Sequence, residues 1–262
     1  MTRRRRRARW SRSVTTARIL MLFAVFALGA CGSSGEPRIV VSGAASLSKA
    51  FNAYGEGFHP ARVSFSFAGS DVLAAQIEQG ARPDVFASAN AKFPEALYEK
   101  GLVQRPVVFA SNKLVLAVPA GSNKVGALAD AEKPGTVLSI GTAEVPVGTY
   151  TATVLERLPA AQRAALLANV RDREPDVTGI VGKLTEGAAD AGFLYLTDVA
   201  ATHGQLKAIA LPASLQPRVS YSAAVVSGSG HEAQARAFVN GLLSGPGRAA
   251  LGAAGFLPPP QS

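Results

Sequence analysis

The chain has 262 residues, 48% of them hydrophobic, which is enough for one large or two medium globular units with a substantial core. Its formal charge is +9, but eight of the 27 basic residues are arginines within the first 18 positions. The remainder carries 19 basic against 18 acidic residues, a net charge of about +1. Because no basic surface is indicated beyond this leader, we expect no nucleic-acid partner.

The first 30 residues follow the pattern of an export signal. The arginines are followed directly by the apolar run at 19–30 (ILMLFAVFALGA), which ends in small residues. This run is too short to span a bilayer as a helix. A basic region, a short apolar region and small residues together predict a signal peptide over residues 1–30.

Cys31 is the only cysteine, so no intrachain disulfide can form. It follows Leu28, Gly29 and Ala30, and this tetrapeptide resembles the bacterial lipoprotein motif, whose cysteine becomes the lipid-bearing N-terminus. We therefore expect a lipid anchor at Cys31, on the extracytoplasmic face of the cell membrane, and a flexible tether over residues 31–37. The alternative is a stray cysteine beside an ordinary cleavage site. No later segment is long and apolar enough to be a transmembrane helix.

Apolar runs and amphipathic stretches alternate from residue 38 onward. The first part of the chain predicts strands at 39–42, 63–67, 85–88 and 113–118, and helices at 47–58, 72–79 and 92–100. Gly80 and Gly101 are placed to end the second and third helices. Regular alternation of strand and helix is typical of an α/β domain with a largely parallel sheet.

The same alternation resumes after Pro119. It predicts strands at 137–141, 191–196, 206–211 and 219–226, and helices at 150–158, 160–168, 179–186, 232–243 and 248–254. Two α/β lobes joined by crossing strands near Pro119 and Pro217 explain this order. We expect lobe 1 to comprise residues 38–116 and 219–257, lobe 2 to comprise 117–218, and residues 258–262 to form a disordered tail.

Enzyme motifs are absent from the sequence. There is no G-x-S-x-G elbow and no H-E-x-x-H. His59, His203 and His231 are far apart, which favours surface or capping roles. The glycines at 179 and 182 lack the spacing of a phosphate-binding loop, and Leu184 stands where Ser or Thr would be needed. We therefore expect no catalytic residues and no site for a free metal cation.

Small and hydroxyl residues stand at the ends of several predicted strands. Ser46 and Ser70 open the first two helices, residues 144–148 and Asp176 open two more, and Tyr195 ends a strand. Each alone is explained as a helix cap, because Ser and Asp are common N-caps. As a group they lie where open α/β sheets bind ligands. Free N–H groups at helix N-termini, together with hydroxyl donors, suit an anion.

These segments resemble the molybdate-binding proteins of bacterial ABC importers. That family carries A-A-S-L, then F-A-x-S-x-x-L-x-x-Q-I-x-x-G followed by D-x-F-x-S-A, then V-P-x-G-x-Y, an acid–valine turn and a strand ending in tyrosine. The long F-A-x-S to D-x-F-x-S-A block is specific, whereas the acid–valine turn is not. The likeness extends over about residues 39–256, and the matching segments are 44–47, 67–80, 84–89, 145–150, 176–177 and 191–195.

The resemblance implies a type II periplasmic-binding-protein fold: two lobes, each a mixed and mostly parallel sheet flanked by helices, with the ligand in the cleft between them. It implies no cofactor and a molybdate or tungstate ligand, so that molybdenum is bound as an oxyanion. It also implies delivery to an ABC permease, and we expect a monomer. The ligand-binding residues that it implies are Ser46, Ser70, Val147, Val177 and Tyr195.

Two departures from the family pattern lie beside Ser70. Gly69 replaces the usual serine, and Asp71 brings a negative charge near the expected anion, so we expect it to face solvent or to cap its own helix. Alternative functions are binding of another oxyanion such as sulfate, an enzyme on the same fold, or a scaffold without ligand. An enzyme would need an acid–base pair in the cleft, for which only Asp71, Asp176 and Tyr195 are candidates.

Overall fold

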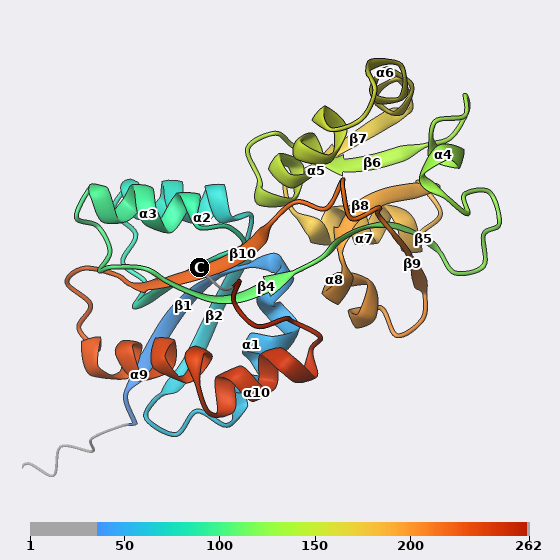
Figure 1. Cartoon of the computed structure of the whole chain (residues 1–262). Coiled ribbons are helices and arrows are strands. Elements are labelled where there is room, and N and C mark those ends of the chain that lie inside the picture. Colours follow the sequence, from blue (N-terminus) through green and yellow to red (C-terminus); the bar gives the residue numbers. More distant parts are fainter. Residues whose placement is uncertain (1–35, 261–262) are drawn as a thin grey trace, which may run out of the picture. The chain divides into compact units, whose positions relative to one another are not determined.

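The computed structural model describes residues 36–260. The predicted signal peptide, the lipidation site Cys31 and the last two residues lie outside the described residues. Within them, no helix is both long enough and apolar enough to cross a membrane. Two five-stranded sheets form the framework, and helices cover them (Figure 1).

The first sheet has four strands running one way and one running the other. β1 is parallel to β2 and β3, whereas β10 is antiparallel to both β3 and β4. The strand order is β2-β1-β3-β10-β4, formed by β1 (Arg38–Ala44), β2 (Arg62–Ala68), β3 (Val85–Ser88), β4 (Val107–Asn112) and β10 (Val219–Val225).

The second sheet repeats this arrangement. β6 is parallel to β7 and β8, whereas β5 is antiparallel to β8 and β9. The order is β7-β6-β8-β5-β9, formed by β5 (Leu114–Pro119), β6 (Leu138–Gly141), β7 (Val170–Glu174), β8 (Ala191–Tyr195) and β9 (Leu206–Ala210). The predicted fold, two mixed and mostly parallel sheets, is confirmed.

The reversed strand of each sheet is the one that arrives from the other sheet. β4 ends at Asn112 and β5 begins at Leu114, so the chain changes sheets at Lys113 (Figure 1). The expected boundary between residues 116 and 117 falls inside β5, because β4 and β5 follow each other almost without a break. The return runs from β9 to β10 through residues 211–218.

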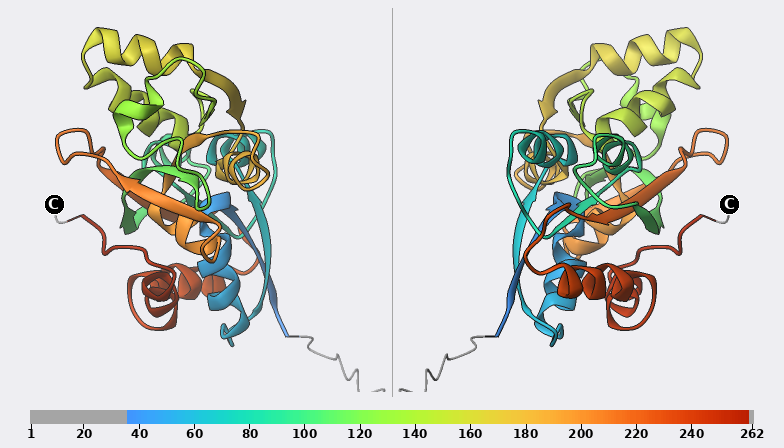
Figure 2. Two further views of the ribbon diagram at one scale, coloured as in Figure 1. Left: turned by 90° about the vertical axis from the view of Figure 1, so that its right-hand side faces the viewer. Right: turned by 90° about the vertical axis from the view of Figure 1, so that its left-hand side faces the viewer.

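Helices α1 (Ser48–Glu56), α9 (Glu232–Leu243) and α10 (Pro246–Ala253) cover one face of the first sheet, and α2 (Ser70–Glu78) and α3 (Lys92–Glu99) cover the other (Figures 1 and 2). The second sheet carries α5 (Pro146–Glu156) and α7 (Val177–Thr185) on β6 and β8, and α8 (Leu196–Ala201) on β8 and β9. The remaining helices are η1 (Ala45–Leu47), α4 (Leu128–Ala131) and α6 (Ala160–Ala168).

Aromatic packing fixes the helices below the first sheet. The Phe238 ring of α9 lies 5.5 Å from Phe51 and 4.6 Å from Tyr54, both in α1, and 5.4 Å from Phe58. The Tyr54 hydroxyl donates a hydrogen bond back to the Phe238 carbonyl oxygen at 3.2 Å. Burial of these large rings contributes about 1.5–3 kcal/mol each and holds α9 against α1.

Sequence patterns missed four elements: β4, α4, β7 and α8. β4 and β7 are edge strands. Four of the five β7 residues are charged, so β7 shows no apolar pattern. β4 was missed although Phe109 and Ala110 in it are buried. α8 begins directly after β8, without the loop that would separate them in the sequence. Of the tail expected at residues 258–262, the structure describes 258–260, and the Pro258 carbonyl oxygen accepts a hydrogen bond from Ser111 Oγ at 2.6 Å.

Candidate functional site

One small hollow brings together all five residues that the resemblance marks as ligand-binding. Its volume is about 20 Å³, far below the roughly 300–1,000 Å³ of pockets for drug-sized organic molecules. Ser46 and Ser70 come from the first-sheet side, and the other three come from the second. The lining residues are Ala44, Ala45, Ser46, Ala68, Gly69, Ser70, Ala89, Val145, Pro146, Val147, Asp176, Val177 and Tyr195.

The five positions meet because each lies at, or shortly after, the carboxyl end of a strand that runs parallel to a neighbouring strand. β1 and β2 lead into η1 and α2, which carry Ser46 and Ser70. β6 and β7 lead into α5 and α7, which begin beside Val147 and at Val177, and Tyr195 is the last residue of β8. The carboxyl ends of such strands share one edge of a sheet, and here the two edges face each other across the hollow.

Three α-helices therefore point their N-termini at the hollow. The first N–H groups of α2, α5 and α7 have no acceptor within their own helices, and the positive ends of the helix dipoles lie there. In α7 the Asp176 carboxylate accepts from Thr178 N at 2.7 Å and Gly179 N at 3.3 Å, but not from Val177 N. The expected capping role of Asp176 is thus confirmed, and the cap leaves Val177 N–H available.

Hydroxyl groups complete the donor set. Tyr195 Oη is fully buried and has no hydrogen-bond partner among the described residues. Ser70 Oγ accepts from Ala89 N at 3.1 Å, so the hydroxyl proton of Ser70 is not used in that bond. Burial raises the pKa of Tyr195 well above its usual value, and Tyr221, Tyr150 and the Asp198 carboxyl raise it further. Tyr195 therefore stays protonated and can act as a donor.

The hollow contains almost no side-chain charge. Among the described residues that line it, Asp176 is the one ionisable acid, and there is no lysine, arginine or histidine. The Asp176 carboxylate is engaged at the α7 N-terminus. An anion in the hollow would thus meet N–H and O–H dipoles rather than cations. No group of three or more potential metal ligands exists within residues 36–260.

Asp71 lies differently from the expectation. Its Oδ1 is buried without a hydrogen-bond partner among the described residues, and no side chain caps α2. The expectation that Asp71 faces solvent or caps its own helix is therefore wrong for Oδ1, which neither faces solvent nor caps α2. The neighbouring Gly69 explains the crowding: a Cβ there would lie 2.6 Å from Asp71 Oδ1 and 2.6 Å from the Pro175 carbonyl oxygen. The lack of a side chain at Gly69 lets the two halves of the site approach closely.

Sequence reasoning missed Asp198, a buried acid behind the site. Its Oδ2 accepts a hydrogen bond from Tyr195 N at 3.1 Å, which fixes the end of β8. Burial raises the pKa of Asp198 to about 8; the Tyr195 N–H bond lowers it, and the charge of Asp176 raises it. Asp198 lines a neighbouring hollow rather than the one described above, so it does not supply an acid–base pair there. The spacing Tyr195-x-x-Asp198 was the available signal.

Comparison with known proteins agrees with this architecture. The profile of the bacterial extracellular solute-binding protein family matches residues 39–257. The molybdate-binding protein ModA of Mycobacterium tuberculosis H37Rv is 32% identical over 252 residues, covering 90% of this chain and 94% of ModA.

Solved structures share the fold. The periplasmic molybdate-binding protein of Azotobacter vinelandii superposes with a TM-score of 0.76 at 22% identity, over 85% of this chain and all of the other. The sulfate-binding protein SubI of M. tuberculosis superposes with a TM-score of 0.75 at 18% identity, over 85% of this chain and 87% of SubI.

Two sheets joined by paired crossovers, with a small donor-lined hollow between them, define a solute-binding protein. The chain belongs to the bacterial extracellular solute-binding protein family, in the branch that includes the molybdate-binding proteins ModA. These relatives are binding proteins, so the expectation that the chain is not an enzyme is confirmed.

The raised pKa of Asp198 predicts a pH-dependent stability. In the unfolded chain an aspartate titrates near ~3.9, so folding favours the protonated form of Asp198. Its contribution to stability is complete below that pH and is lost as pH rises toward about 8. The Asp198→Asn variant keeps an oxygen acceptor for Tyr195 N–H without a charge, so it should escape this loss.

Thermal unfolding between pH 5 and pH 8.5 measures the effect. The wild-type melting temperature should fall relative to that of Asp198→Asn across this range. Glu56→Gln, which removes an exposed carboxyl at the end of α1, is the control and should follow the wild type. Parallel curves for the wild type and Asp198→Asn would contradict a buried, neutral Asp198.

Proposed function

We propose that the chain is an exported lipoprotein that captures molybdate, and equally tungstate, and delivers it to an ABC importer. The observation that carries the proposal is the hollow itself, where N–H and O–H donors from both sheets converge and the buried Tyr195 hydroxyl has no partner among the described residues. Membership of the family that includes ModA supports the same ligand.

The donors account for binding of a dianion without a cation. Hydrogen bonds to a charged group contribute roughly 1.5–3 kcal/mol each, about twice a neutral one. The proposed set comprises the hydroxyls of Ser46, Ser70 and Tyr195 and the main-chain N–H groups of Ser70, Val147 and Val177. Several such bonds acting together replace the water that the anion loses on entering the hollow.

The same donors select the protonation state of the ligand. Every proposed contact offers a hydrogen to the anion, so a fully deprotonated oxyanion can use each of its lone pairs. A hydrogen phosphate would bring an O–H with no acceptor, and a buried unpaired polar group costs about 1–3 kcal/mol. Sulfate has the charge and shape of molybdate but is smaller, so its donor distances would be longer in a hollow sized for molybdate.

Calorimetry with molybdate, tungstate, sulfate and phosphate at pH 7.5 tests the proposed ligand. Molybdate and tungstate should bind with similar and highest affinity, sulfate more weakly and phosphate least. The Tyr195→Phe variant should lose about 10- to 100-fold in molybdate affinity, the equivalent of one charge-assisted hydrogen bond, while remaining folded. Tightest binding of sulfate or phosphate, or an unchanged affinity of Tyr195→Phe, would overturn the assignment.

We further propose that the two sheets belong to two lobes that close on the ligand as a hinge. The division follows the strand pairing, with residues 38–112 and 219–257 in lobe 1 and most of 114–218 in lobe 2. Gly69 in lobe 1 and the Pro175 carbonyl in lobe 2 approach closely beside the hollow. A ligand that bridges both lobes would shift the population toward the closed form, which would dock as a monomer on the permease.

Small-angle scattering with and without molybdate tests closure. The radius of gyration of the wild type should decrease on adding molybdate. Gly69→Ala should show less compaction, because its Cβ would lie 2.6 Å from the Pro175 oxygen, although the backbone at φ −57° tolerates any residue. Gly121→Ala, where a Cβ meets nothing within 4 Å, is the control. Equal radii with and without ligand would refute the hinge.

Lipid anchoring at Cys31 is tested in a bacterial host with the full-length chain. Labelling with a clickable palmitate analogue should mark the wild type, which should sediment with membranes. Cys31→Ser should lose the label and the sedimentation, because the only thiol is gone. Ser33→Ala, two residues away, should behave as the wild type. A wild-type chain that carries no lipid would contradict the anchor.

A further inference from the structure

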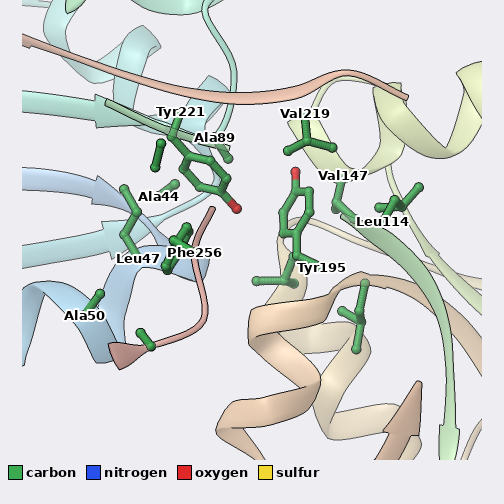
Figure 3. Close-up of a cluster of buried hydrophobic side chains, with 14 of the residues drawn as sticks. Ala44, Leu47, Ala50, Ala89, Leu114, Val147, Tyr195, Val219, Tyr221 and Phe256 are labelled. Atoms are coloured by element: carbon green, nitrogen blue, oxygen red, sulfur yellow. The ribbon is translucent and has the colours of Figure 1, made fainter. Parts of the chain in front are cut away.

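A second tyrosine lies behind the proposed anion site and is not among its lining residues. Tyr221 of β10 is fully buried, and its ring lies 5.8 Å from that of Tyr195 in an edge-on arrangement. Figure 3 shows the two side chains approaching each other from opposite sides, Tyr221 from the first sheet and Tyr195 from the second. The Tyr221 hydroxyl lies 3.0 Å from Ser46 Oγ.

We propose that Tyr221 is a positioning residue that donates to Ser46 Oγ and so turns the hydroxyl proton of Ser46 toward the ligand; we call this pair of hydroxyls the relay. The inference rests on the proposed function, because Ser46 is one of the donors to the oxyanion. It adds to that function the role of Tyr221, which fixes the direction of the Ser46 hydroxyl proton. That direction in turn contributes to the selectivity for deprotonated anions.

The direction of the Ser46–Tyr221 bond decides what Ser46 can do. Either hydroxyl could donate in this pair. If Ser46 donated to Tyr221, its proton would be used there and its lone pairs would face the anion. If Tyr221 donates, Ser46 Oγ accepts and its own proton is free for the hollow.

The proposed role of Ser46 as a donor to the oxyanion requires the second arrangement, because a serine hydroxyl has one proton to give. Burial raises the pKa of Tyr221 well above its usual value, and the Asp198 carboxyl raises it further. Tyr221 thus stays protonated and can donate to Ser46. At the first crossover, Asn112 Oδ1 accepts from Lys113 N at 2.9 Å and Asn112 Nδ2 donates to Thr197 Oγ1 at 2.8 Å.

Residues from both crossovers lie around the relay. Asn112 is the last residue of β4, at the first crossover, and Tyr221 lies in β10, which follows the second. Thr197, in α8, ties Asn112 to the second lobe. The donor direction at Ser46 is therefore set from β10, the strand that follows the second crossover.

The relay predicts a change in selectivity, beyond a loss of affinity. In Tyr221→Phe the Ser46 hydroxyl can rotate and can accept a hydrogen bond from a ligand O–H. The variant should then discriminate less strongly against hydrogen phosphate. If Tyr221 had a merely structural role, its replacement would weaken the binding of all anions by the same factor. Phenylalanine keeps the ring contacts with Tyr195 and Phe256, so the fold should persist.

The experiment measures molybdate and phosphate affinities by calorimetry at pH 7.5 for the wild type and Tyr221→Phe. Molybdate binding by Tyr221→Phe should weaken about three- to tenfold, because Ser46 can still donate but is no longer held in one orientation, and the molybdate-to-phosphate affinity ratio should fall. Tyr54→Phe is the matched control, since it removes a buried tyrosine hydroxyl bonded to the Phe238 carbonyl, away from the hollow. It should keep the wild-type affinities and ratio.

A double-mutant cycle with Ser46→Ala tests whether Tyr221→Phe changes molybdate affinity through Ser46. Once Ser46 is removed, adding Tyr221→Phe should change molybdate affinity by less than about twofold. An unchanged affinity ratio in Tyr221→Phe, or an equal effect of that substitution with and without Ser46, would overturn the relay. A wild type that binds none of the tested oxyanions would overturn the proposed function and the relay together. A wild type that binds molybdate, with an unchanged affinity ratio in Tyr221→Phe, would overturn the relay alone.

Discussion

The structure depends on uncharged hydrogen-bond donors that converge on one small hollow from the carboxyl ends of strands in two sheets. Helix N-termini leave N–H groups unpaired, and such groups are costly to bury unless an acceptor meets them. α2, α5 and α7 place three such ends around the hollow, and the buried Tyr195 hydroxyl adds a fourth donor without a partner among the described residues. An oxyanion satisfies all of these groups at once, which makes the hollow and its proposed ligand complementary.

The paired crossovers make this convergence possible. Because β5 and β10 each enter the opposite sheet in the reversed direction, both sheets keep four strands that run in the same direction, and three of these in each sheet lead into residues that line the hollow. Tyr221, which follows the second crossover, contacts Ser46, and Asn112, at the first crossover, donates to Thr197 of the second lobe. Gly69 allows the Pro175 carbonyl of the other lobe to come close, and Asp198 fixes the end of β8. The strands that connect the two lobes thus also help to position the groups around the hollow.

Sequence patterns predicted the elements with strong periodicity. The strand at Val85–Ser88 and the helix at Glu232–Leu243 have the predicted bounds, and the alternation predicted two α/β lobes with largely parallel sheets. β7 was missed because an exposed edge strand needs no apolar side, and α8 because it follows β8 without a loop. The five expected ligand residues came from a family resemblance, and in the structure all five line one hollow. Tyr221 and Asn112 could not be found this way, because the Ser46–Tyr221 contact joins residues 175 positions apart.

A crystal structure of the protein with molybdate, with anomalous scattering measured at the molybdenum K edge, tests the central claim most directly. The account predicts a single anomalous peak in the hollow, with every oxygen of the anion within hydrogen-bond distance of the N–H and O–H donors. No lysine or arginine nitrogen should contact the anion. A peak elsewhere in the molecule, or an anion held by a cationic side chain, would contradict the account.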